Sequence, residues 1–299
     1  MKARLSHIRF VLYAAFVVFG FVTAGTFEPK GIDAAGFYSP SIESIRVSTS
    51  AYGADVNPLN LIAGSNTTFH VNGTISDMDG YGDIATVQAY FYRSSIGPWC
   101  SSDTNYCYHH PACALANGSG ASVDYDCELS VAYFADSTDD SSSYASDTWN
   151  AYIYATDYSN YNAVRGDYTN EINSLRAIAT SGAITYGNLG LGQATSSPRT
   201  LSIINQGNTP TSAEFSSTGM TCVFGTVPPT AQKFDTVWRS YASMQYTLST
   251  TPINGNIFLA QQTDDYYPQT TWTYWQIQVP TIGVSGDCSG YNTVTAVSL

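Results

Sequence analysis

Short runs in which apolar and polar residues alternate, each closed by Gly, Asn or Asp, constrain the fold of this chain most strongly. The clearest runs cover residues 84–93, 149–156 and 271–279. A period of two places alternate side chains on one face of a β-strand. No run of helical period and comparable length follows the N-terminal segment. Strand-sized runs separated by turn residues predict an all-β, antiparallel protein.

Composition and length agree with this class of fold. Charged residues make up 11% of the 299 residues, against about 25% in an ordinary soluble domain. The exposed faces of helices normally carry those charges, so their scarcity counts against a helical protein. The 23 tyrosines suit strands. Because one sandwich takes about 100 residues, the length fits two sandwiches and a leader.

The turn signals divide the mature chain into two units. We predict a first sandwich over residues 41–168, which includes a cysteine-rich loop, and a second over residues 169–299. Within them, the Gly, Asn and Asp content of residues 157–167 predicts a turn region. Residues 184–189 and 293–297 are predicted to form short strands.

The N-terminal segment has the parts of an export signal. Basic residues precede an apolar run over residues 10–22, and residues 22–24 form a small-residue cleavage pattern. We therefore predict a signal peptide over residues 1–24 and a linker over residues 25–40. The apolar run is shorter than the roughly 20 residues that cross a bilayer. An uncleaved leader that anchors the chain is the alternative, and it is the only membrane contact that we expect.

Six cysteines in an exported chain predict disulfide bonds. Four lie in the first predicted sandwich and two in the second: Cys100, Cys107, Cys113, Cys127, Cys222 and Cys288. The last two pair by elimination. The first four allow three pairings, among which we favour Cys100–Cys107 with Cys113–Cys127. Export and disulfides together predict a secreted or cell-surface location.

Several of these segments resemble a known group. Residues 74–80, Thr-Ile-Ser-Asp-Met-Asp-Gly, followed by residues 83–87, Asp-Ile-Ala-Thr-Val, resemble a recurring turn of prokaryotic immunoglobulin-like domains, as does the strand that ends at Asp157. Residues 201–208 and 274–280 are similar to the other half of secreted bacterial proteins of this kind. The resemblance implies tandem immunoglobulin-like β-sandwiches in a secreted or surface protein. It implies no activity, because the group has no catalytic residues to carry over.

Asp77, Asp79 and Asp83 form the strongest candidate for a metal site. Carboxylates that alternate in a Gly-bearing loop can surround Ca²⁺ with oxygen ligands. An EF-hand is ruled out, because its twelfth position would be Gln88 and no helices flank the loop. A calcium site at the edge of a sandwich, helped by Asp157, is the hypothesis. The simpler interpretation is an Asp/Gly turn between two strands, with no cofactor at all.

Aromatic residues near the C-terminus form the candidate ligand-binding site: Trp272, Tyr274, Tyr266 and Tyr267. If Trp275 points into the core, Trp272 and Tyr274 point outward, because positions alternate along a strand. Exposed aromatic rings can stack on sugars or anchor a protein partner. The simpler interpretation is that a neighbouring strand or loop covers them.

Catalysis finds little support in the sequence. The G-x-S-x-G motif is absent. His70 alternates with Phe69 and Val71, which predicts an exposed position. The pair Asp139-Asp140 lies in a polar loop, which predicts solvated carboxylates and not a glycosidase pair. We therefore expect no enzyme activity.

The charge and the surface residues indicate what partners to expect. A net charge of −12 repels phosphate backbones, so no nucleic-acid partner is expected. We expect a non-catalytic extracellular surface protein with a structural or adhesive role. Its partner is a cell-surface protein, a glycan or another copy of the chain. A carbohydrate-binding module is the alternative, ahead of a filament subunit or a secreted hydrolase.

Overall fold

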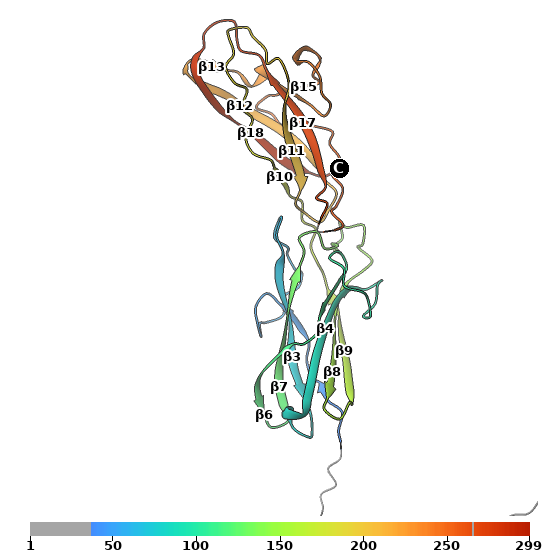
Figure 1. Ribbon diagram of the computed structural model, residues 1–299. Helices are drawn as coiled ribbons and strands as arrows, with labels where there is room; N and C mark the ends of the chain where they lie inside the picture. Colours follow the sequence, from blue (N-terminus) through green and yellow to red (C-terminus); the bar gives the residue numbers. More distant parts are fainter. Residues whose placement is uncertain (1–36, 265) are drawn as a thin grey trace, which may run out of the picture. The chain divides into compact units, whose positions relative to one another are not determined.

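The computed structural model describes residues 37–264 and 266–299, and the predicted signal peptide and most of the predicted linker lie outside these residues. Regular structure in the described part consists of β-strands and three short 3-10 turns, η1 (Tyr81–Asp83), η2 (Pro229–Ala231) and η3 (Tyr241–Ser243). The strands form four antiparallel sheets, which are consistent with two sandwiches (Figure 1). The predicted all-β, antiparallel class is confirmed.

The first two sheets come from residues 41–170. One sheet has the order β1 (Ser41–Ile42), β3 (Thr67–Ser76), β7 (Ser122–Val131) and β6 (Ala114–Ser119), with β2 (Arg46–Ser48) paired to β3. The other has the order β5 (Cys107–His110), β4 (Ile84–Arg93), β8 (Trp149–Asp157) and β9 (Asn162–Asn170).

Inward-facing side chains of these two sheets form one hydrophobic core. Trp149 and Ile153 of β8 are fully buried there, as the alternation in this run predicts. The ring of Phe91 stacks on that of Trp149, with centroids 4.8 Å apart. Trp149 Nε1 donates a hydrogen bond to the carbonyl of Asp136 at 2.8 Å, so burial leaves its only donor satisfied.

The other two sheets come from residues 178–297. One has the order β10 (Ile178–Thr180), β11 (Arg199–Asn205), β17 (Thr270–Ile277), β14 (Gln232–Asp235) and β15 (Tyr246–Thr247). The other contains β13 (Thr226–Val227), β12 (Ser212–Phe224) and β16 (Ile253–Asn254), with β18 (Ser285–Val297) paired to β12. A second hydrophobic core, which includes Trp275, Phe215 and Phe234, serves these sheets.

Two expectations about strands are wrong, and a third, the strand over residues 293–297, covers only the end of the strand that forms. Residues 157–167 contain the start of β9 at Asn162, and β18 begins at Ser285 instead of Thr293. Residues 184–189 form no strand. Both β9 and β18 pair with one neighbour each and are largely exposed. An edge strand of this kind has few buried side chains, so most of its sequence lacks the alternation that identifies a strand.

Three disulfide bonds join Cys100–Cys107, Cys113–Cys127 and Cys222–Cys288, the pairing favoured from the sequence. Cys222 and Cys288 lie opposite each other in β12 and β18. The Cys113–Cys127 bond joins the segment before β6 to the centre of β7. Three disulfides are typical of an oxidising, extracellular environment.

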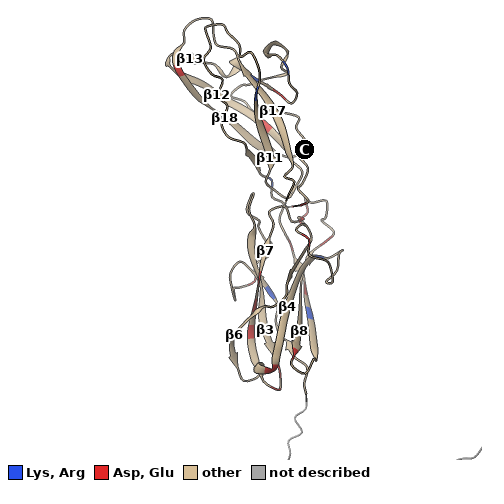
Figure 2. Ribbon diagram, viewed as in Figure 1, with Lys and Arg blue, Asp and Glu red and all other residues tan. Residues whose placement is uncertain are grey.

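Charged residues are sparse on all four sheets (Figure 2). Most exposed strand positions carry Ser, Thr, Asn or Tyr instead. In the described part of the chain, no helix has the length and apolar character needed to cross a membrane.

Candidate functional site

The outward face of β17 carries two of the four aromatic residues that the sequence singles out. Trp272 is 53% exposed and Tyr274 is half-buried. The alternate residues of the strand, Thr273 and Trp275, are fully buried. In the sheet, Trp272 lies opposite Ser202 of β11. Because Ser202 is small, the Trp272 ring keeps much of its surface available to a ligand.

Tyr266 and Tyr267 precede β17 and are both exposed. Their backbone N–H groups donate to the same carboxylate oxygen, Oδ1 of Asp264, at 2.8 Å each. That carboxylate therefore fixes the backbone just before the strand. Within the described residues, no ring contact joins any two of Tyr266, Tyr267, Trp272 and Tyr274.

A second group of aromatic rings lies on the outward face of the sheet that contains β4, β5 and β8. The Trp99 ring meets Tyr90, Tyr152 and Tyr154 edge-on, with centroids 5.4, 5.7 and 5.9 Å away. The His109 ring stacks on that of Tyr90 at 4.2 Å. We call these five residues the Trp99 cluster. The five residues are not among the candidate binding residues predicted from the sequence.

Strand pairing assembles this cluster. Tyr90 lies opposite both His109 of β5 and Tyr152 of β8. Tyr152 and Tyr154 occupy the positions between the buried residues of β8, so their rings point away from the core. The one sequence signal for the cluster is the tyrosines that alternate with the buried residues of the 149–156 run.

The surroundings of the Trp99 cluster favour the neutral form of its histidine. Partial burial, and to a lesser degree the neighbouring His110, lowers the pKa of His109 below its usual value. A neutral imidazole stacks on a tyrosine as one more aromatic surface. The cluster therefore presents rings and hydroxyl groups with no formal charge.

The loop between β3 and β4 brings together the three predicted metal ligands. One carboxylate oxygen from each of Asp77, Asp79 and Asp83 lies within 4.8 Å of the other two. Asp77 is buried, Asp83 is partly exposed and Asp79 is exposed. Gly80 has a φ of 106°, a conformation that favours glycine and lets the chain turn between Asp79 and η1. We call Asp77, Asp79 and Asp83 the acidic loop.

The charges of the acidic loop repel one another. Burial raises the pKa of Asp77, a hydrogen bond from the Asp79 backbone opposes this shift, and the charges of Asp79, Asp83 and Asp157 raise the pKa further. Asp157 ends β8 and is itself buried. No Lys or Arg in the described residues forms an ion pair with any of these four carboxylates.

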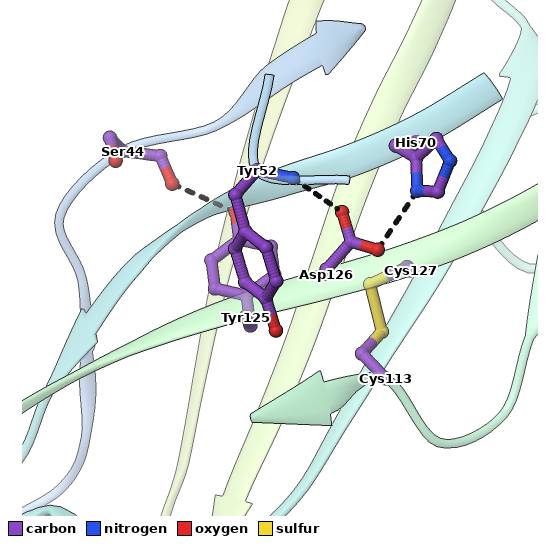
Figure 3. The surroundings of a disulfide bond; sticks show 7 residues. All are labelled: Ser44, Tyr52, His70, Cys113, Tyr125, Asp126 and Cys127. Atoms are coloured by element: carbon purple, nitrogen blue, oxygen red, sulfur yellow. Dashed lines mark hydrogen bonds and ion pairs between the residues drawn. A yellow bond between two sulfur atoms is a disulfide. The ribbon is translucent and has the colours of Figure 1, made fainter. Parts of the chain in front are cut away.

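His70, which the strand pattern places on an exposed face, is buried, so that expectation is wrong. Figure 3 shows its ring beside Asp126 and the Cys113–Cys127 bond. His70 Nδ1 lies 2.8 Å from Asp126 Oδ2, and Asp126 Oδ1 accepts the Tyr52 N–H at 3.2 Å. The pattern fails because β2 pairs with this part of β3 and the turn at Tyr52 reaches Asp126.

In the part of the chain that the structure describes, no hydroxyl group completes a nucleophilic triad with His70 and Asp126. The nearest strand neighbour with a hydroxyl, Ser48, donates to the carbonyl of Ser50 and accepts from Asn72. Within the described residues, no Ser or Thr hydroxyl forms a hydrogen bond with His70. A Ser–His–Asp arrangement needs that contact.

Comparison with protein-family models gives no match for this sequence, and comparison with curated proteins gives none either. The class that the structure defines is a disulfide-bonded, all-β protein with antiparallel sheets and exposed aromatic residues.

Proposed function

We propose that this chain is a non-catalytic extracellular surface protein with a structural or adhesive role, built from two immunoglobulin-like sandwiches. The observation that carries the proposal is the Trp99 cluster, in which an exposed Trp ring packs against partly buried aromatic rings on the outer face of one sheet. The three disulfides support an extracellular location, because such bonds persist in oxidising compartments. The resemblance to tandem immunoglobulin-like surface proteins supports the same role.

The geometry of the Trp99 cluster favours binding. Trp99 is 64% exposed, although its ring meets three tyrosines. Trp and Tyr are enriched among the residues that dominate binding energy at interfaces. Neighbours that already hold the indole in place reduce the conformational entropy lost when a partner binds. The uncharged, hydroxyl-bearing rings suit a cell-surface protein or a glycan.

Trp99→Ala is expected to weaken binding of the purified protein to cells by about 30-fold, which corresponds to a hot-spot loss of about 2 kcal/mol. The reason is that alanine removes the exposed ring at the centre of the cluster and leaves the core strands unchanged. Fluorescently labelled protein is titrated onto intact cells of the source organism, and the apparent Kd is measured by flow cytometry.

Trp238→Ala is the matched control. Trp238 is also 64% exposed, and no described aromatic ring contacts it. We expect its apparent Kd to stay within about twofold of the parent value, as for an energetically neutral surface residue. Equal losses in the two variants, or no saturable binding of the parent protein, contradict the adhesive role of the cluster.

A carbohydrate-binding module is the second candidate function, and the exposed ring of Trp272 on β17 favours it. The same titration separates the two candidates. Soluble glycans for this test are chosen with a glycan array, run with and without calcium. If the protein is a carbohydrate-binding module, these glycans compete with cells for the protein, and Trp272→Ala abolishes the binding to cells. Binding that survives Trp272→Ala but is lost in Trp99→Ala supports the first proposal.

A further inference from the structure

We propose that the acidic loop forms a binding site for Ca²⁺ at the end of the first pair of sheets, with the charge of Asp157 beside it. The spacing of the carboxylates fits one ion. Ca²⁺ lies about 2.3–2.6 Å from its oxygen ligands, so two oxygens on the same ion are at most about 5 Å apart. One oxygen from each aspartate of the acidic loop meets this condition, since all three lie within 4.8 Å of one another.

A buried, unpartnered carboxylate oxygen is the second observation. Asp77 is only 1% exposed. Its Oδ1 accepts the N–H of Asp79 at 2.9 Å, whereas its Oδ2 has no hydrogen-bond partner among residues 37–264 and 266–299. An unsatisfied buried carboxylate oxygen is costly. The turn thus uses one oxygen of Asp77 and leaves the other for a ligand.

Asp157 repeats this arrangement from another strand. It is 2% exposed, its Oδ1 accepts the N–H of Tyr161 at 2.8 Å, and its Oδ2 has no hydrogen-bond partner in the described part of the chain. Asp157 lies opposite Ile84, the residue that follows Asp83. Asp77 and Asp157 are thus two buried carboxylates with no basic partner among the described residues. A bound cation would balance their charge.

The ligand types select the ion. The site offers carboxylate oxygens, with no Cys or His in the cluster, so a hard cation is favoured over Zn²⁺ or Cu²⁺. Mg²⁺ demands near-ideal octahedral geometry and gives up its water reluctantly, whereas Ca²⁺ accepts irregular sets of six to eight oxygens. Asp83 and Asp79 are partly or fully exposed, which leaves room for water molecules to complete the shell.

Binding at this site connects three parts of the first unit. Asp77 follows β3, Asp83 immediately precedes β4, and Asp157 ends β8. In addition, Asp79 Oδ2 accepts the backbone N–H of Tyr38 at 2.8 Å. The ion therefore holds together the turn between β3 and β4, which is bonded to the segment at Tyr38 and lies next to the end of β8.

Asp83→Asn is the variant that tests the site. Among the described residues, the Asp83 side chain forms no hydrogen bond or ion pair, so the substitution removes a ligand charge without removing a contact that the structure describes. Isothermal titration calorimetry on chelator-treated, purified protein is expected to show one Ca²⁺ site with a Kd on the order of 10⁻⁴–10⁻³ M, as in extracellular modules. In about 10 mM CaCl₂ the melting temperature is expected to rise by about 5 °C.

Asp83→Asn is expected to raise the Kd for Ca²⁺ at least about tenfold, because the charge of the ligands sets the affinity of calcium sites. Asp140→Asn removes the same charge from an exposed position outside the acidic loop and is expected to change the Kd by less than about twofold, as for a screened surface charge. Absence of both heat and a melting shift with the parent protein overturns the proposal. Equal losses in the two variants, or equal affinity for Mg²⁺, also overturn it.

Discussion

Trp275→Ala is expected to lower the free energy of unfolding by about 3–5 kcal/mol, the range for truncation of a buried Trp. Trp275 is fully buried at the centre of the second core. Its ring stacks on Phe234 at 5.3 Å and meets Phe215 at 5.8 Å. Alanine leaves a cavity that these rigid neighbours fill only in part.

The hydrogen bonds around Trp275 add to the loss. Trp275 Nε1 donates to Thr273 Oγ1 at 2.8 Å, and that hydroxyl donates to the Leu201 carbonyl at 3.0 Å. The chain of bonds joins β17 to β11, and the substitution removes its first member. An unpaired buried acceptor costs about 1–3 kcal/mol where no water replaces the donor.

Guanidinium unfolding followed by circular dichroism measures the effect of Trp275→Ala. The dependence of the unfolding free energy on denaturant concentration should stay the same, which shows that the same amount of surface is exposed on unfolding. Trp272→Ala, on the other face of the same strand, is the control and is expected to cost less than about 0.5 kcal/mol, as surface substitutions usually do. A loss below about 1 kcal/mol for Trp275→Ala contradicts the assignment of this ring to the centre of the core.

Replacement of both Cys222 and Cys288 by Ser is expected to lower the free energy of unfolding by about 4 kcal/mol. The two residues are 66 positions apart in sequence, and a crosslink over a loop of this length restricts the unfolded chain by about that amount. The bond joins β12 directly to β18, an edge strand that is mostly exposed. Few buried side chains hold β18 in place, so the covalent bond contributes a large share.

The Cys100→Ser/Cys107→Ser variant is the comparison for this second prediction. Its residues are only 7 positions apart, for which loop closure predicts a loss of about 2–3 kcal/mol. The same unfolding experiment, run on oxidised proteins with the remaining bonds intact, compares the two. A larger loss for the short loop than for the long one contradicts the loop-closure explanation.

Local patterns predict central strands well. The run over residues 84–93 corresponds to β4 (Ile84–Arg93), and the run over residues 149–156 to β8 (Trp149–Asp157). These strands have two neighbours and one buried face, so burial imposes alternation on their sequences. The edge strands β9 and β18 carry no such signal, because solvent reaches most of their side chains.

The same distinction applies to the candidate sites. The acidic loop lies within seven consecutive residues, and a turn brings its carboxylates together, so its pattern is visible in the sequence. The Trp99 cluster depends on the pairing of β4 with both β5 and β8. It also depends on the path of the loop after β4, which places the Trp99 ring against Tyr90. Sequence spacing alone does not determine these distances. His70 was misplaced for the same reason, since β2 and the turn at Tyr52 cover it.

The most direct test of the proposed extracellular role is antibody labelling of cells that naturally make the protein, before and after permeabilisation, combined with alkylation of its cysteines without reductant. We expect antibodies against residues 37–299 to label intact cells or the medium, and all six cysteines to resist alkylation, because they form three disulfides. Labelling that requires permeabilisation, with cysteines open to alkylation, contradicts an extracellular surface protein.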